Sequence, residues 1–299
     1  MGSNELKFGV VGTAYWAETV HAPGVARAKG ARLAGVWGRD PLKAAAIADA
    51  CGTRPYSSFD ALLADVDALT FAVPPSVQAE LAPRAIEAGK HVLLEKPISL
   101  DPGSAERIAA SVLSRGLGSL VFFTRRFVPE IAVALERAKS RRWRRATVEV
   151  LAGALTVGSP YQNSIWRQEE GAALWDIGPH VLSLLVPVLG PVVAQRALVT
   201  ESGFSRFETT HRDGAVATCA VTLRASPIDR CNRYVFEDGD SRLALPEPSI
   251  DYPPVFARAV DELCAAIRTT GGRHPLDVQF GLETVRVIDS IARDTKRRS

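Results

Sequence analysis

Short, almost wholly apolar runs alternate with longer amphipathic stretches over the first third of the chain. The apolar runs have the length and composition of strands buried on both faces, and they cover Leu6–Gly12, Arg32–Trp37, Ala68–Val73 and His91–Leu94. Helices are predicted between them, over Ala14–Lys29, from Asp40-Pro41 onward, over Phe59–Leu63 and over Val77–Ala88. This alternation predicts an α/β domain with a doubly wound parallel sheet and right-handed crossovers.

The pattern changes after about residue 123. From there on, the predicted strands place successive side chains of different kinds on the two faces of a sheet. Arg145–Leu151 and Ala215–Leu223 alternate in a way that is typical of antiparallel strands. Further strands are predicted over Val192–Glu201, Ser205–His211, Cys231–Glu237 and Ser241–Leu245, and helices over Val255–Thr269 and Leu276–Asp294. We therefore predict two domains, 1–122 and 123–299, the second an α+β domain with a large, open, mostly antiparallel sheet.

The residues on one face of the Ala215–Leu223 strand indicate that this face is covered by another protein surface. It carries Val216, Thr218, Ala220 and Thr222, which are small or weakly polar, where a solvent-facing strand would carry charges. We expect a second copy of the chain to cover this face, as a homodimer or homotetramer formed through the C-terminal sheet.

Composition narrows the class of protein. The chain has 299 residues, 46% of them hydrophobic, and its 36 basic and 33 acidic residues are too balanced to indicate a nucleic-acid surface. The uncharged run Val181–Ala194 is too short for a membrane span, so a buried helix is predicted. Cys51, Cys219, Cys231 and Cys264 lie far apart, which indicates neither a metal site nor disulfides and favours the reducing cytoplasm.

The junction of the first strand and helix has the spacing of a dinucleotide-binding turn. Gly12, Thr13, Ala14, Tyr15 and Trp16, followed by an alanine, reproduce G-x-G-x-x-G spacing with alanine at the second and third glycine positions. A bare structural turn is the alternative. The position at the first βα junction favours a cofactor site in a Rossmann domain, where the pyrophosphate meets the helix N-terminus.

The end of the second strand bears on the choice of cofactor. An acidic side chain there binds the ribose hydroxyls of NAD, whereas an arginine suits the 2′-phosphate of NADP. Here Gly38 occupies the usual acidic position, Arg39 follows it, and Asp40 is more simply the cap of the next helix. NADP(H) is favoured, with NAD(H) as the alternative if Arg39 only covers the surface or stacks on adenine.

Two further segments carry groups that can move a proton. Lys96 lies in Glu95-Lys96-Pro97 after an apolar strand, and Asp176 and His180 lie four residues apart, on one face of a helix. His180 can exchange a proton with an alcohol, and Asp176 can orient a substrate hydroxyl or the imidazole. Lys96 can polarise a carbonyl oxygen, stabilise a developing alkoxide or relay the proton. The alternatives are an exposed strand-end lysine and a helix-surface pair.

Together these segments resemble one family over nearly the whole chain. The turn GTAYWA, the Pro74-Pro75 loop, HVLLEKPIS, Trp166-Arg167 and AALWDIGPHVLSLL occur in the order and spacing of the glucose-fructose oxidoreductase/inositol dehydrogenase/MocA (Gfo/Idh/MocA) family. The resemblance implies a Rossmann domain, an oligomer-forming C-terminal sheet and redox chemistry at a sugar or cyclitol carbon. It also implies that Lys96, with Pro74 and Glu95, lies beside the nicotinamide, and that Asp176 and His180 face the substrate.

Some positions depart from the family pattern. Gln78 and Ser183 stand where a histidine and an aspartate are frequent, which indicates a substrate less polyhydroxylated than inositol. The glycine-rich run before the Asp176 motif is replaced by Glu169-Glu170-Gly171, which brings charge and bulk. Arg125-Arg126-Phe127 resembles a strand-end motif in which an arginine meets an anionic substrate or holds a structural ion pair.

The residues and the resemblance predict an NAD(P)-dependent oxidoreductase. It transfers a hydride between nicotinamide and a carbinol or carbonyl carbon of a sugar, sugar derivative, cyclitol or other small cyclic substrate. One alternative is a redox-assisted glycosidase of the same family, which uses bound NAD without net oxidation. Another is a non-catalytic sensor or scaffold that binds NADP(H).

Overall fold

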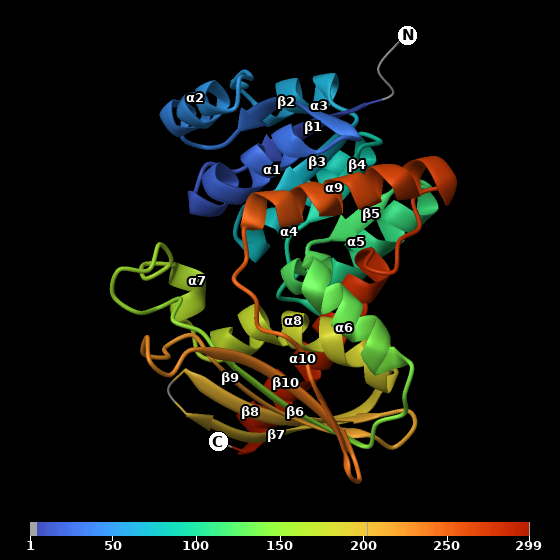
Figure 1. Ribbon diagram of the computed structural model, residues 1–299. Helices are drawn as coiled ribbons and strands as arrows, with labels where there is room; N and C mark the ends of the chain where they lie inside the picture. The colour runs from blue at the N-terminus through green and yellow to red at the C-terminus, as the bar shows by residue number, and fades with distance from the viewer. Residues whose placement is uncertain (1–4, 202, 299) are drawn as a thin grey trace. The chain divides into compact units, whose positions relative to one another are not determined.

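The computed structural model describes residues 5–201 and 203–298 and separates into two compact units (Figure 1). The first unit comprises the residues up to Phe127 and the later segment Ile250–Leu282. The second comprises Val128–Ser249 and the residues from Glu283 onward. The sequence-based division assigned the helix near 255–269 to the second domain, but the structure places it in the first. Periodicity identifies a helix without identifying the surface that buries it.

The first unit is built on a five-stranded parallel sheet. Its strands are β1 (Leu6–Val11), β2 (Ala31–Trp37), β3 (Ala68–Phe71), β4 (His91–Leu94) and β5 (Ser119–Val121), in the order β2-β1-β3-β4-β5. An isolated parallel bridge from Val36 to Pro55 adds a minimal strand outside β2. With that bridge the order corresponds to 3-2-1-4-5-6, so the predicted Rossmann topology is confirmed.

Helices complete the first unit, and three of them begin at a capping side chain (Asp40, Ser58 and Asp101). The helices are α1 (Ala22–Arg27), α2 (Pro41–Ala50), α3 (Phe59–Asp65), α4 (Pro75–Glu87), α5 (Pro102–Ser114) and α9 (Tyr252–Thr269), with the 3₁₀ turn η2 (Thr124–Phe127). Asp40 caps α2 as predicted, because its carboxylate accepts from the Leu42 and Lys43 amides at 3.1 Å. The helix predicted over Ala14–Lys29 is not uniform: the π-helical segment η1 (Ala17–His21) precedes α1.

The second unit contains a six-stranded mixed sheet. Its elements are α6 (Pro129–Lys139), β6 (Arg145–Leu151), α7 (Ile165–Gln168), α8 (Ala172–Leu189), β7 (Val192–Glu201), β8 (Phe204–His211), β9 (Val216–Thr222), β10 (Cys231–Asp238), β11 (Ser241–Ala244) and most of α10 (Val278–Arg298). The strand order is β11-β10-β6-β9-β8-β7, and among the described strands only β6 and β9 pair in parallel. The predicted α/β fold class, with a large, mostly antiparallel second sheet, is confirmed.

The sheet face expected to be covered is uncharged only along β9. Thr218 is exposed, and its register partner on β8 is Glu208, which forms an ion pair with Arg196 at 3.0 Å. On the other side of β9, Glu149 of β6 pairs with Arg233 at 2.7 Å. The premise that this face lacks charges is therefore wrong beyond one strand, because alternation within β9 says nothing about its neighbours. The oligomer stays a prediction.

The apolar helix α8 forms the core of the second unit. It packs against β6, β8 and β9, and its end coincides with Gly190, whose φ of 85° suits glycine. By length and hydropathy it is the one helix in the described ranges that could cross a membrane, yet 72% of it is buried inside the structure. A core helix in this position agrees with the buried helix predicted from Val181 onward.

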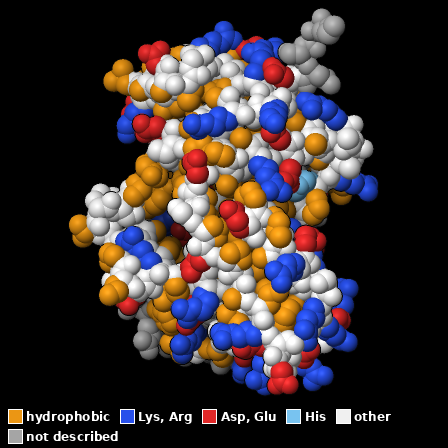
Figure 2. All heavy atoms as spheres, viewed as in Figure 1, with side chains coloured by type: hydrophobic (Ala, Val, Ile, Leu, Met, Phe, Trp, Pro, Cys, Tyr) orange, Lys and Arg blue, Asp and Glu red, His pale blue; other side chains and the backbone are white. Residues whose placement is uncertain are grey.

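Surface charges of the second unit are largely paired. Arg142 lies 3.8 Å from Asp213, and Arg144 lies 3.4 Å from Asp238, so the basic segment after α6 meets acidic turns. Figure 2 shows basic and acidic side chains interspersed on the visible face. Pairs this exposed contribute little to stability, because water and salt screen them.

The contact between α9 and the α1–β2 connection generates a first prediction. Asp261 of α9 accepts hydrogen bonds from the backbone amides of Lys29 and Gly30, both at 2.8 Å. We expect Asp261→Ala to lower the free energy of unfolding by about 2 kcal/mol, because two amides lose a charged acceptor. Urea denaturation measures the change.

Asp60→Ala is the matched control for this prediction. The Asp60 side chain is 75% exposed and pairs with Arg84 on the surface. Its removal is expected to change stability by only about 0.5 kcal/mol. Equal losses in the two variants would contradict the assignment of α9 as a stabilising part of the first unit.

Candidate functional site

The predicted cofactor residues of the first unit gather at one edge of its sheet. Gly12, Gly38 and Glu95 directly follow β1, β2 and β4, and Pro74 lies three residues after β3, at the N-cap of α4. Parallel strands end at the same edge, and dinucleotides bind at that edge where the strand order reverses, here between β1 and β3. The fold therefore brings these predicted residues to the same edge of the sheet, at the point where the strand order reverses.

The turn after β1 is shaped for a close approach of backbone to ligand. Gly12 has a φ of 128°, and a Cβ atom there would lie 2.4 Å from the Ala72 carbonyl oxygen. The following helix opens with a hydrogen bond from the Glu18 amide to the Ala14 oxygen at 3.1 Å, so the amides of Tyr15 and Trp16 lie in its first turn. A glycine turn leading into a helix N-terminus fits the pyrophosphate of a dinucleotide.

The end of β2 leaves little space for an acidic side chain. A Cβ atom on Gly38 would lie 2.5 Å from the Thr13 methyl carbon, so these two residues pack closely. Arg39 is exposed and forms no ion pair with another described residue. The Asp40 carboxylate is engaged as the α2 cap. The strand end therefore presents a guanidinium and no uncommitted carboxylate.

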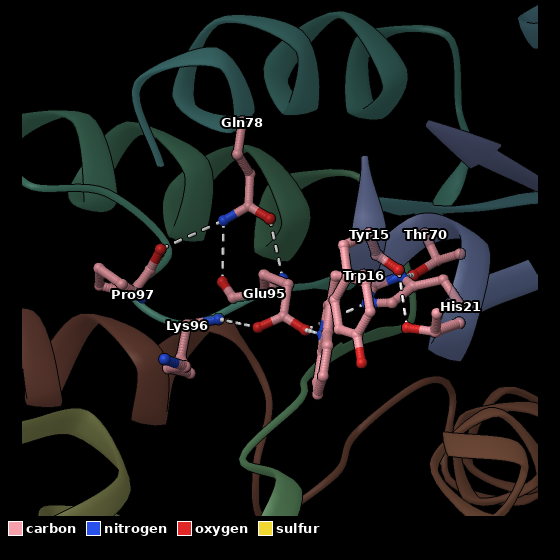
Figure 3. Close-up of polar contacts among 9 residues, drawn as sticks. Tyr15, Trp16, His21, Thr70, Gln78, Glu95, Lys96 and Pro97 are labelled. Carbon is pink, nitrogen blue, oxygen red and sulfur yellow. Dashed lines mark hydrogen bonds and ion pairs between the residues drawn. The ribbon is translucent and has the colours of Figure 1, made fainter. Parts of the chain in front are cut away.

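The Glu95 carboxylate joins this turn to the loop that carries Lys96 (Figure 3). Its Oε1 atom accepts from the Trp16 indole nitrogen at 2.7 Å and lies 3.1 Å from His21 Nε2. Its Oε2 atom accepts from the Lys96 backbone amide at 3.2 Å, and the Lys96–Pro97 peptide is cis. Sequence reasoning identified Glu95, Trp16 and Lys96 but missed His21, which lies outside the G-x-G-x-x-G pattern.

Gln78 fixes the backbone of the same loop. Its side chain is fully buried, accepts from the Glu95 amide at 2.8 Å and donates to the Glu95 carbonyl at 2.8 Å. Its amide nitrogen also lies 3.3 Å from the Pro97 and Ile98 carbonyl oxygens. The sequence analysis treated Gln78 as a lost substrate contact, whereas the structure shows it holding the Lys96 loop.

Aromatic rings flank the helix N-terminus. The Trp16 and Tyr252 rings meet edge to face with centroids 5.0 Å apart, and Tyr15 is 45% exposed. Burial raises the pKa of the Tyr252 phenol, and the nearby Arg125 charge opposes that shift. Arg125 is only 8% exposed, so this member of the Arg125-Arg126 pair lies inside the first unit.

Within the second unit, Asp176 and His180 lie one turn apart on α8 as predicted. Asp176 is held by Arg167, whose Nε lies 2.7 Å and whose Nη2 lies 3.4 Å from its two oxygens. The Arg167 guanidinium lies over the rings of Tyr161 at 4.5 Å and Trp166 at 4.4 Å. Arg167 was noted only as part of a family motif, and its pairing with Asp176 was not foreseen.

The remaining motif positions on α8 serve its local structure. Ser183 is fully buried and donates to the His180 carbonyl at 2.7 Å. Gly171 begins the helix with a φ of 76°, and Glu169 and Glu170 are exposed. In the segment that replaces the family's glycine-rich run, Gly171 is therefore the glycine that the backbone conformation requires. The two glutamates of this segment face solvent.

Comparison with known proteins agrees with this picture. A family model described as "Oxidoreductase family, NAD-binding Rossmann fold" matches residues 6–122. The dTDP-3,4-didehydro-2,6-dideoxy-α-D-glucose 3-reductase of Streptomyces antibioticus is 31% identical over an alignment that covers 98% of this chain and 99% of the reductase.

Solved structures share the complete fold. UDP-N-acetylglucosamine 3-dehydrogenase GnnA from Acidithiobacillus ferrooxidans superposes with a TM-score of 0.81 at 23% identity, covering 98% of both chains. GenD2 from gentamicin A biosynthesis, solved in complex with NAD, gives a TM-score of 0.85 at 18% identity and covers 99% of this chain and 95% of GenD2.

The fold, the glycine turn and these relationships define an oxidoreductase with an NAD-binding Rossmann domain. Within that class, the chain belongs to the Gfo/Idh/MocA family.

The turn at Gly12 generates a second prediction. We expect Gly12→Ala to abolish NADPH and NADH binding and to lower the free energy of unfolding by about 3 kcal/mol, because the added methyl group meets the Ala72 oxygen in a strained conformation. Fluorescence titration and urea denaturation measure the two effects.

Gly89→Ala separates backbone strain from the loss of the site. Gly89 also has a positive φ, 74°, but a Cβ atom there would meet no described atom within 4 Å. This variant is expected to lose about 1 kcal/mol and to bind both cofactors normally. Unchanged cofactor binding by Gly12→Ala would refute the proposed role of the turn.

Proposed function

We propose that this protein is an NADP(H)-preferring oxidoreductase that transfers a hydride between nicotinamide and a carbinol or carbonyl carbon of a sugar derivative. The observation that carries the proposal is the Glu95 carboxylate, which joins the dinucleotide turn to the loop of Lys96. A lysine fixed beside a dinucleotide turn is placed to act on the atom that exchanges hydride with nicotinamide.

In this proposal, three side chains act on the substrate oxygen or on the segment around it, and the cofactor carries the hydride. The bound nicotinamide supplies or accepts the hydride. His180 gives a proton to the substrate oxygen in reduction and takes it in oxidation. The Lys96 ammonium group donates a hydrogen bond to the same oxygen and stabilises negative charge that develops there. Asp176, already paired with Arg167, orients the segment around His180.

Relatives support a keto-sugar as the substrate class. The Streptomyces antibioticus relative is named as a 3-reductase of a dideoxy sugar linked to dTDP. The Acidithiobacillus ferrooxidans relative is named as a UDP-N-acetylglucosamine 3-dehydrogenase, and it is 36% identical over 33% of this chain. We therefore propose a deoxygenated or amino-substituted sugar, reduced or oxidised at a ring carbon.

A turnover assay tests the reaction type. With NADPH and nucleotide-linked keto-deoxysugars we expect absorbance at 340 nm to fall, and we expect His180→Ala and Lys96→Ala to lower kcat by about 10²–10⁴-fold. Cofactor binding by His180→Ala should stay unchanged. Ser183→Ala, which removes the hydrogen bond to the His180 carbonyl within α8, is the control and should retain most of the activity.

Other outcomes of this assay identify the alternatives. Cleavage of glycosides without net change in NADPH would favour the redox-assisted glycosidase. Tight NADPH binding with no turnover of any sugar, indifferent to His180→Ala, would favour the sensor or scaffold.

Cofactor preference depends on Arg39 and has its own test. We expect Arg39→Ala to weaken NADPH binding by about 10–100-fold, because a charge-assisted contact to the 2′-phosphate is lost, and to leave NADH binding within about twofold. Arg32→Ala is the control, since Arg32 is exposed at the opposite end of β2. Equal affinities of wild type for NADPH and NADH would contradict the preference.

A further inference from the structure

A buried polar network lies beneath the dinucleotide turn and has no part in the proton chemistry proposed above. It runs from Thr70 on β3 to His21, at 2.9 Å, and from His21 to the Glu95 carboxylate, at 3.1 Å. Trp16 donates to the same Glu95 oxygen at 2.7 Å. Thr70 and His21 are fully buried, and the Glu95 side chain is only 13% exposed.

The π-helical segment η1 is what allows two donors of one helix to reach one oxygen. Trp16 and His21 are five positions apart, and in an α-helix five residues leave side chains about 140° apart around the axis. Here the Ala22 amide donates to the Ala17 oxygen, five residues back, so the helix is wider over this turn. That widening brings the indole and imidazole to the same face, where Glu95 lies.

The protonation pattern of the network is fixed by its burial. Burial lowers the pKa of His21 despite the opposing influence of Glu95, so the ring is neutral near pH 7. A neutral ring that donates from Nε2 to the carboxylate must accept at Nδ1 from the Thr70 hydroxyl. Each hydrogen bond from Thr70 through His21 to Glu95 then has one donor and one acceptor, which makes the network rigid.

The network ends at the residue that carries the proposed chemistry. Glu95 Oε2 accepts from the Lys96 amide, and the Lys96 side chain extends from that amide away from the carboxylate (Figure 3). Gln78 holds the neighbouring carbonyl groups from α4, which is a separate attachment. Of these two attachments, only the one through Glu95 leads to the helix whose N-terminus forms the dinucleotide turn.

We propose that Glu95, Trp16 and His21 form a coupling element that orders the Lys96 segment when a dinucleotide occupies the turn. These are positioning residues, and the proposal rests on the function proposed above. A ligand that restrains the first turn of the helix restrains Trp16, and the shared carboxylate transmits that restraint to the Lys96 amide. Dinucleotide binding thereby further restrains a Lys96 segment that the network already holds.

Hydrogen–deuterium exchange on the full-length protein, with and without saturating NADPH, tests this coupling. In the wild type we expect NADPH to slow exchange in the turn, residues 12–18, and to slow exchange of the Lys96 amide about tenfold. In Trp16→Phe, which keeps an aromatic ring but loses the N–H donor, protection of the turn should persist. Protection of Lys96 should fall below about twofold.

Trp143→Phe is the matched control. Its buried indole donates to the Ala138 oxygen at 2.8 Å in the second unit, so it loses an equivalent hydrogen bond away from the turn. Lys96 protection by NADPH should remain at the wild-type level in this variant. Glu95→Gln provides a second test, because it keeps the shape of the side chain but weakens its contacts to Trp16, His21 and the Lys96 amide. It should uncouple Lys96 as Trp16→Phe does.

The outcomes separate the inference from the function on which it rests. Full NADPH protection of Lys96 in Trp16→Phe and Glu95→Gln would overturn the coupling element while leaving the cofactor site intact. Equal loss of Lys96 protection in Trp143→Phe would also overturn it, because the effect would then be one of general stability. A wild-type protein with no protection by NADPH or NADH anywhere would overturn the proposed function and the coupling together.

Discussion

Burial of the Glu95 carboxylate is the constraint on which the arrangement of the first unit depends. A carboxylate removed from water must receive hydrogen bonds, and this one receives them from an indole, an imidazole and a backbone amide. Those donors come from the helix after β1 and from the loop after β4. Satisfying a single charge therefore fixes the two elements that the proposed reaction needs together, and it accounts for the π-helical turn that would otherwise weaken the helix.

The sequence predicted most of the fold because local signals and topology agreed. Apolar runs located β1 to β4, and the Asp40-Pro41 pair located the start of α2. The misses have a common cause. The π turn at Ala17–His21 and the placement of α9 in the first unit depend on partners far away in the chain, such as Glu95 and the amides of Lys29 and Gly30. Periodicity carries no record of such partners.

The candidate site was predictable to the extent that its residues occur in short motifs. Gly12 could be predicted from spacing, because backbone geometry at a βα turn dictates the residue type. Glu95 and Lys96 could be identified because they lie in a short motif that resembles the family. Gln78 and Arg167 could not be assigned roles in this way. Each acts through a contact to a segment other than its own, Gln78 on the Lys96 loop and Arg167 on Asp176. Only the folded chain shows that these polar side chains support the motifs.

The two carboxylates of the candidate machinery also restrict which groups can move a proton. The Asp176 oxygens face a guanidinium held between two aromatic rings, and those of Glu95 face three N–H groups. These contacts compensate the burial of both carboxylates. Each carboxylate is therefore better suited to holding its neighbours in place. In the proposed reaction, proton transfer is assigned to His180, whose imidazole can exchange an N–H proton with the substrate.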